Sequence, residues 1–103
     1  MAEVIWTEPA LSDLDAIADH IALDKPSAAR ALVARVFDHV GQLADHPRSG
    51  SRPRELRDSR YRQIVEPPCR IFYRLTGAQV VILHVMRSEQ RVRRSSLGRA
   101  SAR

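Results

Sequence analysis

Several features are scarce in this chain of 103 residues, and each scarcity excludes a class of protein. Cys69 is the only cysteine, so no disulfide can form within the chain. No purely apolar run is longer than Val80 to Leu83, which is far shorter than the roughly 20 residues of a transmembrane helix. The first residues, Met1 to Val4, lack the basic and long apolar segments of a signal peptide. We therefore expect a cytoplasmic protein of one domain that makes no contact with a membrane.

Glycines and aromatic residues are also few, which limits the kinds of binding site. The 4 glycines are scattered singly, so the sequence contains no phosphate-cradling loop. Only Tyr61 and Phe72 are aromatics flanked by arginines, and two are too few for a specific reader of single-stranded nucleic acid. The histidines His20, His39 and His46 show no metal-ligand spacing with Cys69. We expect no metal and no cofactor.

Positive charge is abundant and unevenly distributed. Residues 1–47 carry three basic side chains and eight acidic ones (3 − 8 = −5), whereas residues 48–103 carry fourteen arginines and four acidic side chains (14 − 4 = +10). A basic half of this kind attracts nucleic acid, acidic protein surfaces or acidic peptides. A genomic preference for arginine codons would explain arginine in place of lysine, but not the confinement of the charge to one half.

Apolar residues at helical spacing predict two helices in the first half. The first runs from about Glu8 to Leu23, with Thr7 as its capping residue and Leu11, Leu14, Ile17, Ala18 and Ile21 on its apolar side. A second helix follows the break at residues 24–27, with Asp24 as the expected cap, and ends before Pro47. Their short connection predicts an antiparallel helical hairpin. The expected buried side of the second helix consists of Ala29, Leu32, Val33, Val36, Phe37, Val40 and Leu43.

Short β-branched and aromatic runs predict the strands. They are residues 3–6, 61–65, 69–75 and 80–86, with a surface loop at 46–58, a rigid corner at Pro67 and Pro68, and a hairpin turn at 76–79. The predicted fold is α+β, in the order β-α-α-β-β-β, with the helical hairpin packed on a mostly antiparallel sheet. This domain spans residues 1–89, and residues 90–103 form a basic tail that we expect to be flexible.

The order of these elements resembles the ParE branch of the ParE/RelE superfamily of toxins from bacterial toxin–antitoxin pairs. The resemblance covers about residues 3–89. It depends on four fragments, which are Val4-Ile5-Trp6-Thr7-Glu8-Pro9-Ala10, Asp45-His46-Pro47-Arg48-Ser49-Gly50, Arg54-Glu55-Leu56-Arg57 and Cys69-Arg70-Ile71-Phe72-Tyr73-Arg74. Cys69 departs from the aromatic residue that the resemblance expects before Arg70.

The resemblance implies a toxin that inhibits DNA gyrase and is neutralised by a cognate antitoxin in a hetero-oligomer. Contact with DNA would then occur only through the antitoxin or gyrase. Two alternatives remain open: a ribosome-dependent messenger RNA endoribonuclease of the RelE branch, and a non-toxic module that binds its antitoxin.

Strand alternation predicts which residues of the hairpin bind a partner. It directs Cys69, Ile71, Tyr73 and Leu75 toward the helices, and Arg70, Phe72 and Arg74 toward solvent or a partner. We expect Cys69 to be a small buried thiol. The arginines expected to bind the target or the antitoxin are Arg62, Arg70, Arg74, Arg87 and Arg91.

The sequence offers few groups for the proton transfers that RNA cleavage requires. Residues 88–94 contain no tyrosine and no histidine. His84 shares the strand alternation of Val80, Ile82 and Met86, which favours a histidine at the edge of the core. Glu89 lies beside Arg87 and Arg91 and is expected to be a weak base. We therefore expect no catalytic residue, and this deficit favours the gyrase inhibitor over the endoribonuclease.

Overall fold

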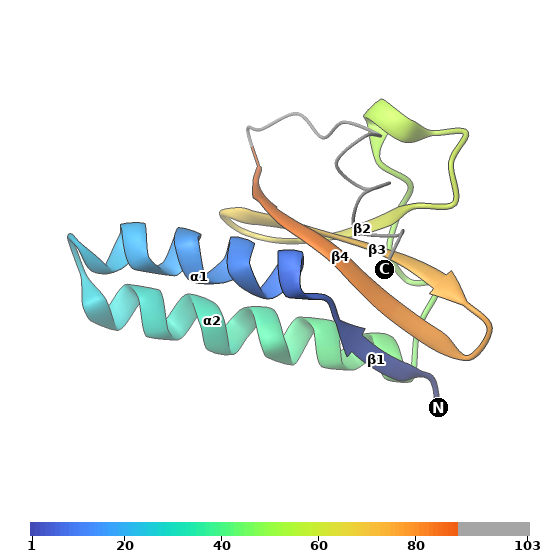
Figure 1. Ribbon diagram of the computed structural model, residues 1–103, viewed down its shortest axis with the longest axis horizontal. Coiled ribbons are helices and arrows are strands. Elements are labelled where there is room, and N and C mark those ends of the chain that lie inside the picture. The colour runs from blue at the N-terminus through green and yellow to red at the C-terminus, as the bar shows by residue number, and fades with distance from the viewer. Residues whose placement is uncertain (89–103) are drawn as a thin grey trace.

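The computed structural model describes residues 1–88, which form two helices packed on one face of a four-stranded sheet (Figure 1). Strand β1 (Glu3–Trp6) leads directly into helix α1 (Glu8–Ala22), and α2 (Pro26–Gly41) returns beside it. Two short 3-10 helices, η1 (Gln42–Ala44) and η2 (Arg54–Leu56), lie in the connection to the sheet. The predicted tail lies outside the described residues. None of the helices described is long and apolar enough to cross a membrane.

The sheet has the spatial order β1-β4-β3-β2, in which the first and last strands of the chain are neighbours. Strands β2 (Arg62–Glu66), β3 (Cys69–Thr76) and β4 (Gln79–Arg87) pair antiparallel, and β1 pairs parallel with β4. The peptide bond between Pro67 and Pro68 is cis at the corner that joins β2 to β3. The predicted α+β class, element order and mostly antiparallel sheet are confirmed.

The two helices begin differently, because α1 has a side-chain cap and α2 has none. Thr7 caps α1 as predicted, because its hydroxyl accepts a hydrogen bond from the Ala10 amide at 3.4 Å and donates one to the Ile82 carbonyl at 2.7 Å. The prediction that Asp24 caps α2 is wrong. The capping position is Lys25, which has no side-chain hydrogen bond to the helix, and Pro26 occupies the first turn.

The main core lies between the helices and the sheet. Leu14 of α1 and Leu32 and Val36 of α2 are buried against Ile71 of β3 and Ile82 of β4. Phe37 was expected in this core, but its exposed fraction is 42 %. Its ring lies 4.8 Å from that of Trp6, at the margin where β1 meets α2. The residue therefore covers the edge of the core and is only partly removed from water.

The loop that contains η2 lies over the opposite face of the sheet (Figure 1). A second, smaller core lies beneath this loop. Leu56 of η2, Phe72 of β3 and Leu83 of β4 are buried together there, and Tyr61, Val81 and Met86 pack against them. The prediction that Phe72 faces solvent or a partner is wrong, since its exposed fraction is 0 %. Strand alternation gave its face correctly, but the loop covers that face.

A bulge in the β3–β4 ladder reverses the alternation of the last strand. Phe72 pairs with His84 and Tyr73 with Ile82, so Leu83 is an extra residue on β4. As a result Val85 joins the main core and Met86 the smaller one, contrary to the predicted grouping of Met86 with Val80 and Ile82.

Candidate functional site: the arginines of the sheet and its covering loop

Arg70 lies at the centre of a polar network on the loop-covered face of the sheet. Its two terminal nitrogens contact the two carboxylate oxygens of Glu55 at 3.0 and 2.8 Å. Its Nε and one terminal nitrogen donate to Oε1 of Gln63 at 3.1 and 2.8 Å. The guanidinium carbon lies 4.9 Å from the centroid of the Phe72 ring, over the ring.

The prediction that Arg70 projects into solvent is wrong. Its side chain is 11 % exposed and that of Glu55 14 %. A bidentate pair of this geometry fixes the guanidinium plane, and here it joins η2 to β3. Arg70 therefore holds the loop against the sheet, and its binding to a partner stays a prediction.

Two more of the predicted arginines also have contacts within the domain. Arg62 donates to the carbonyl oxygens of Gly50 at 2.8 Å and Arg48 at 3.2 Å, and so fastens the start of the loop to β2. Arg74 donates to the hydroxyl of Thr76, and its buried Nε has no hydrogen-bond partner among the described residues.

The remaining two lie at the end of the chain. Arg87 ends β4 and lines a depression with Ala16, Ile17 and His20 of α1. Arg91 lies outside the described residues. The four predicted arginines within residues 1–88 thus do not form one open surface.

Sequence reasoning missed the exposed arginines of the loop itself. They are Arg48, Arg52, Arg54, Arg57 and Arg60, all exposed to solvent. The signal was present, because these five and Arg62 fall within fifteen consecutive positions, 48–62. The interpretation as a surface loop did not predict that the segment packs on the sheet and keeps these five arginines exposed to solvent.

Of the candidate proton-transfer groups, His84 is engaged in structural contacts. Glu89 lies outside the described residues. Nδ1 of His84 lies 2.7 Å from a carboxylate oxygen of Asp13, and the same oxygen accepts the Val85 amide at 3.1 Å. This carboxylate replaces a strand partner, because β1 ends at Trp6 and leaves the edge of β4 unpaired beyond Ile82. His84 is thus a histidine at the edge of the core, as predicted, and is 15 % exposed.

The Tyr73 hydroxyl is fixed between two backbone groups. It accepts a hydrogen bond from the Gly50 amide at 2.9 Å and donates one to the Pro47 carbonyl at 2.8 Å. Burial raises the pKa of Tyr73 above its ordinary value, while the Gly50 amide and the charge of Arg62 oppose this rise. The phenol therefore remains protonated near neutral pH and is a poor base. Cys69, predicted to be a buried thiol, is fully buried.

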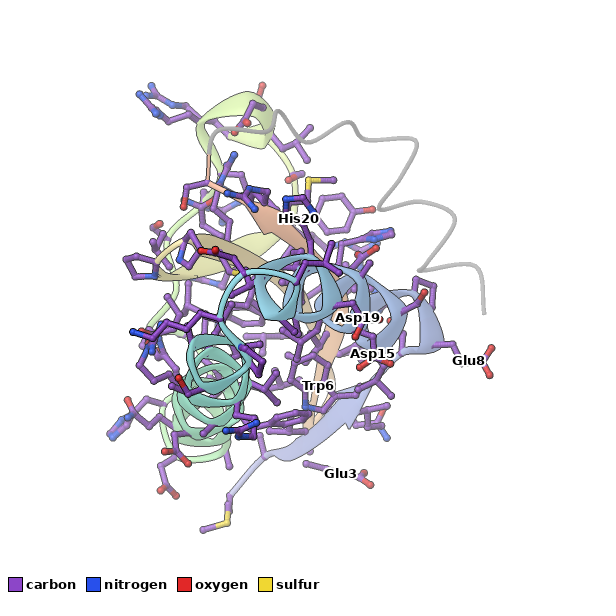
Figure 2. All side chains as sticks on the ribbon, turned by 90° about the vertical axis from the view of Figure 1, so that its left-hand side faces the viewer. Glu3, Trp6, Glu8, Asp15, Asp19 and His20 are labelled. Carbon is purple, nitrogen blue, oxygen red and sulfur yellow. The ribbon has the colours of Figure 1, made fainter. Side chains whose placement is uncertain are left out.

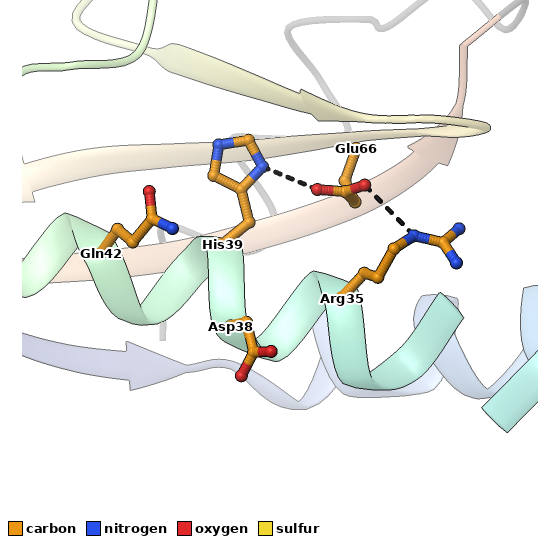
Figure 3. Close-up of a pocket in the computed structure, with 5 residues that line it drawn as sticks. All are labelled: Arg35, Asp38, His39, Gln42 and Glu66. Atoms are coloured by element: carbon orange, nitrogen blue, oxygen red, sulfur yellow. Dashed lines mark hydrogen bonds and ion pairs between the residues drawn. The ribbon is translucent and has the colours of Figure 1, made fainter. Parts of the chain in front are cut away.

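A separate ionic cluster joins α2 to the end of β2 (Figure 3). One carboxylate oxygen of Glu66 lies 3.3 Å from Nε of Arg35, and the other lies 3.1 Å from Nδ1 of His39. Arg35 also donates to the Pro67 carbonyl at 3.2 Å. Asp38 and Gln42 complete the rim of the shallow depression. Within residues 1–88 no group of three or more histidine, cysteine, aspartate or glutamate side chains is arranged to hold a metal ion.

The acidic charge lies on the helical layer. Figure 2 shows Glu8, Asp15 and Asp19 along one side of α1, and all three are exposed. The arginine-rich loop covers the other face of the sheet (Figure 1). The charge asymmetry of the sequence is therefore also an asymmetry between two faces of the molecule.

Comparison with known proteins agrees with this architecture. Residues 4–92 match the sequence model of the ParE toxin of the type II toxin–antitoxin system parDE. A candidate toxin of Sinorhizobium fredii, Y4kP, is 40 % identical over 85 residues, which cover 82 % of this chain and 86 % of that protein. Toxin RelE2 of Caulobacter vibrioides is 35 % identical over 86 residues, covering 82 % of this chain and 93 % of that protein.

A solved structure of the chromosomal ParDE system from P. aeruginosa has the same fold. It superposes with a TM-score of 0.72 at 29 % sequence identity, and the match covers 86 % of this chain and 98 % of that one. Family, fold and element order thus agree along most of the described residues. The chain belongs to the ParE toxin family of type II toxin–antitoxin systems.

Proposed function

We propose that this protein inhibits DNA gyrase when free, does so by binding and without catalysing a reaction, and is neutralised by a cognate antitoxin. Membership of the ParE toxin family supports the toxin role and implies an antitoxin partner. The choice between binding and catalysis depends on the basic face of the sheet.

The observation that carries the proposal is that the guanidinium of Arg70 is bound by side chains of the same domain. An endoribonuclease needs a cation free to stabilise the charge of the phosphorane and a group free to take the proton of the 2′-hydroxyl. Here the guanidinium of Arg70 is bound on two sides by Glu55 and Gln63. The imidazole of His84 is bound by Asp13. A surface of this kind is suited to recognition more than to chemistry.

Capture by an antitoxin is supported by the helical hairpin. Ala18 and Ala22 of α1 and Ala29 and Val33 of α2 line a mostly apolar groove of about 420 Å³, with charged side chains at its rim. Such a groove suits an amphipathic segment that becomes ordered on binding. Co-expression with the adjacent gene should yield a complex in affinity purification. Recovery of this protein alone, soluble and harmless to its host, would contradict the proposal.

Gyrase supercoiling is the direct test of the target. The purified full-length chain should inhibit supercoiling or increase cleaved DNA, and an equal amount of antitoxin should reverse the effect. Primer extension on translated messages provides the second arm, in which messenger RNA should remain intact. Codon-specific cuts at the ribosomal A site would show that the target is wrong.

One observation favours the endoribonuclease as a second candidate. His20 and Arg87 line one depression, which pairs an exposed imidazole with a guanidinium. If messages are cut, His20→Ala should abolish cutting while His46→Ala, which removes another exposed histidine, should not. A protein inactive in both arms but still bound by the antitoxin would be the non-toxic module.

A further inference from the structure

The exposed arginines of the loop form a surface with a role of its own. Arg48, Arg52, Arg54, Arg57 and Arg60, here called the arginine ledge, are all exposed and occur within thirteen consecutive positions, 48–60. None of them forms an ion pair within the described part of the chain. Glu55, which lies in the middle of this segment, is directed inward to Arg70. Asp58 is the one exposed acidic residue of the segment.

The backbone beneath the ledge is held at several points. Pro53 and Leu56 are buried, and Leu56 contributes to the smaller core. Ser51 exchanges two backbone hydrogen bonds with Gln63 of β2, at 3.0 and 2.7 Å. The Ser59 hydroxyl donates to the Leu56 carbonyl at 2.6 Å. The backbone that carries the ledge is therefore fixed, and binding a ligand does not require ordering it.

The chemistry of the ledge identifies its ligand as a phosphate backbone. Guanidinium groups fork onto phosphate oxygens, and several spaced along a surface contact successive phosphates. Binding of single strands also requires exposed aromatic rings on which bases stack. Tyr61 beside the ledge packs against the smaller core, and Trp6 of β1 lies against Phe37 of α2, on the side of the sheet that the helices cover. The ledge thus offers charge without a stacking platform, which favours a duplex.

We propose that the arginine ledge binds the phosphate backbone of duplex DNA directly, without reading its sequence. The two-faced charge of the molecule supports this orientation, because the acidic residues of α1 lie on the helical layer. A DNA surface would repel that layer and attract the ledge. This contact is independent of gyrase and of the antitoxin, so its test does not depend on either.

Salt-dependent binding provides the experiment. The full-length protein is titrated against a fluorescent duplex of about 30 base pairs at several salt concentrations, and the slope of log Kobs against log [salt] is measured by anisotropy. Each phosphate contact contributes about 0.9 to that slope, so Arg57→Gln/Arg60→Gln should reduce its magnitude by about 1.8. Arg54→Gln/Arg57→Gln, a second pair from the ledge, should behave alike.

The matched control removes the same charge from the helical layer. Lys25 and Arg30 are exposed at the start of α2, and Lys25→Gln/Arg30→Gln changes the net charge by the same two units. Its slope should equal that of the unaltered protein. Thermal unfolding of all variants verifies that they are folded.

Three results would overturn the proposal. Equal losses of slope in the ledge and control variants would indicate attraction by net charge alone. Tighter binding of a single-stranded oligonucleotide than of the duplex would assign the ledge to single strands. If the ledge variants lost binding to an acidic peptide while their DNA binding stayed unchanged, the ledge would be assigned to a protein partner.

Discussion

At the scale of single residues, Arg70 shows how a surface position in a strand pattern becomes a buried ionic contact. The alternation of β3 correctly directs Arg70 and Phe72 to the same side, away from the helices. A strand pattern does not show that η2 covers this side of the sheet. Glu55 of η2, the partner of Arg70, lies 15 positions earlier in the chain. The partner of Arg70 could not be predicted from the strand, because Glu55 looks like any loop carboxylate.

Replacing Arg70 should therefore reduce stability, which an exposed arginine would not do. Arg70→Met removes the cation that binds both Glu55 and Gln63, and should lower the free energy of unfolding by about 3–5 kcal/mol. Arg57→Met, an exposed neighbour in the ledge, should change it by at most about 0.5 kcal/mol. Urea denaturation of both variants measures the difference.

A double-mutant cycle tests the same contact. Arg70→Met combined with Glu55→Leu removes both charges, and its cost should be smaller than the sum of the two single costs. Additive costs would show that the two side chains act independently.

Tyr73 predicts a dependence of stability on alkaline pH. Burial raises the pKa of Tyr73 above 10.0, so the folded state favours the protonated phenol. Its contribution to stability is complete below the pKa in the unfolded chain and is lost as the pH rises through the folded-state pKa. Tyr73→Phe should cost about 1–3 kcal/mol at pH 7, because the Gly50 amide loses its acceptor.

The expected signature is a cost that shrinks with pH. The stability of the unaltered protein should fall more steeply than that of Tyr73→Phe above about pH 10, as followed by urea denaturation at a series of pH values. Parallel pH profiles for the two proteins would contradict this assignment of the phenol.

At the scale of elements, the helices, strands and their order could be predicted from the sequence, but the packing of the loop on the sheet could not. Apolar spacing is local, so both ends of α1 and the start of α2 are predicted to within a residue or two, whereas α2 ends at Gly41, short of the predicted stop at Pro47. The loop depends on contacts between distant residues, among them Tyr73 with Pro47 and Gly50. The bulge at Leu83 is also a property of two strands together, which is why the positions of Val85 and Met86 were not predicted.

Gly50 sets how closely the loop approaches the sheet. A methyl group added there would lie 2.5 Å from the Tyr73 hydroxyl oxygen and 2.7 Å from the Gln63 carbonyl oxygen, which belongs to the backbone and cannot rotate away. Gly50→Ala should cost about 1–3 kcal/mol through overpacking.

The other glycine to compare is Gly41 at the end of α2, where an added methyl group has no neighbour within 4 Å. Gly41→Ala should leave stability unchanged or raise it by about 0.5–1 kcal/mol. The melting temperatures of the two variants, measured by thermal unfolding, should therefore differ clearly. A neutral Gly50→Ala would show that the loop can move away from β3.

Docking of α1 onto the edge of β4 depends on Asp13. Asp13→Ala removes the acceptor of the Val85 amide and the partner of His84, and should cost about 1–3 kcal/mol. Asp15→Ala, on the exposed side of the same helix, should change stability by at most about 0.5 kcal/mol. Amide hydrogen exchange at Val85 should accelerate in the first variant only. Unchanged protection there would mean that a different group satisfies the edge.

At the scale of the whole molecule, the fold class and the charge asymmetry follow from the sequence, and the distribution of function over the surface does not. Counting charges in each half predicts an acidic helical layer and a basic remainder. It does not predict that Arg62 and Arg70 are used internally while the ledge arginines remain exposed. That division arises from the smaller core, which fixes which side of the loop meets water.

The pairing of β1 with β4 has a consequence for the synthesis of the protein. Thr7 and Ile82 are 75 positions apart, yet their hydrogen bond and the adjoining strand pair close the sheet. At about 5–20 residues per second, translation from Gly41 to Arg87 takes roughly 2–9 s. During that interval the helical hairpin has been made, but the strands that cover its apolar side have not. The nascent chain thus exposes its helices before it has a basic face, so an antitoxin that binds the helical hairpin, as proposed above, would find its site before the sheet is complete.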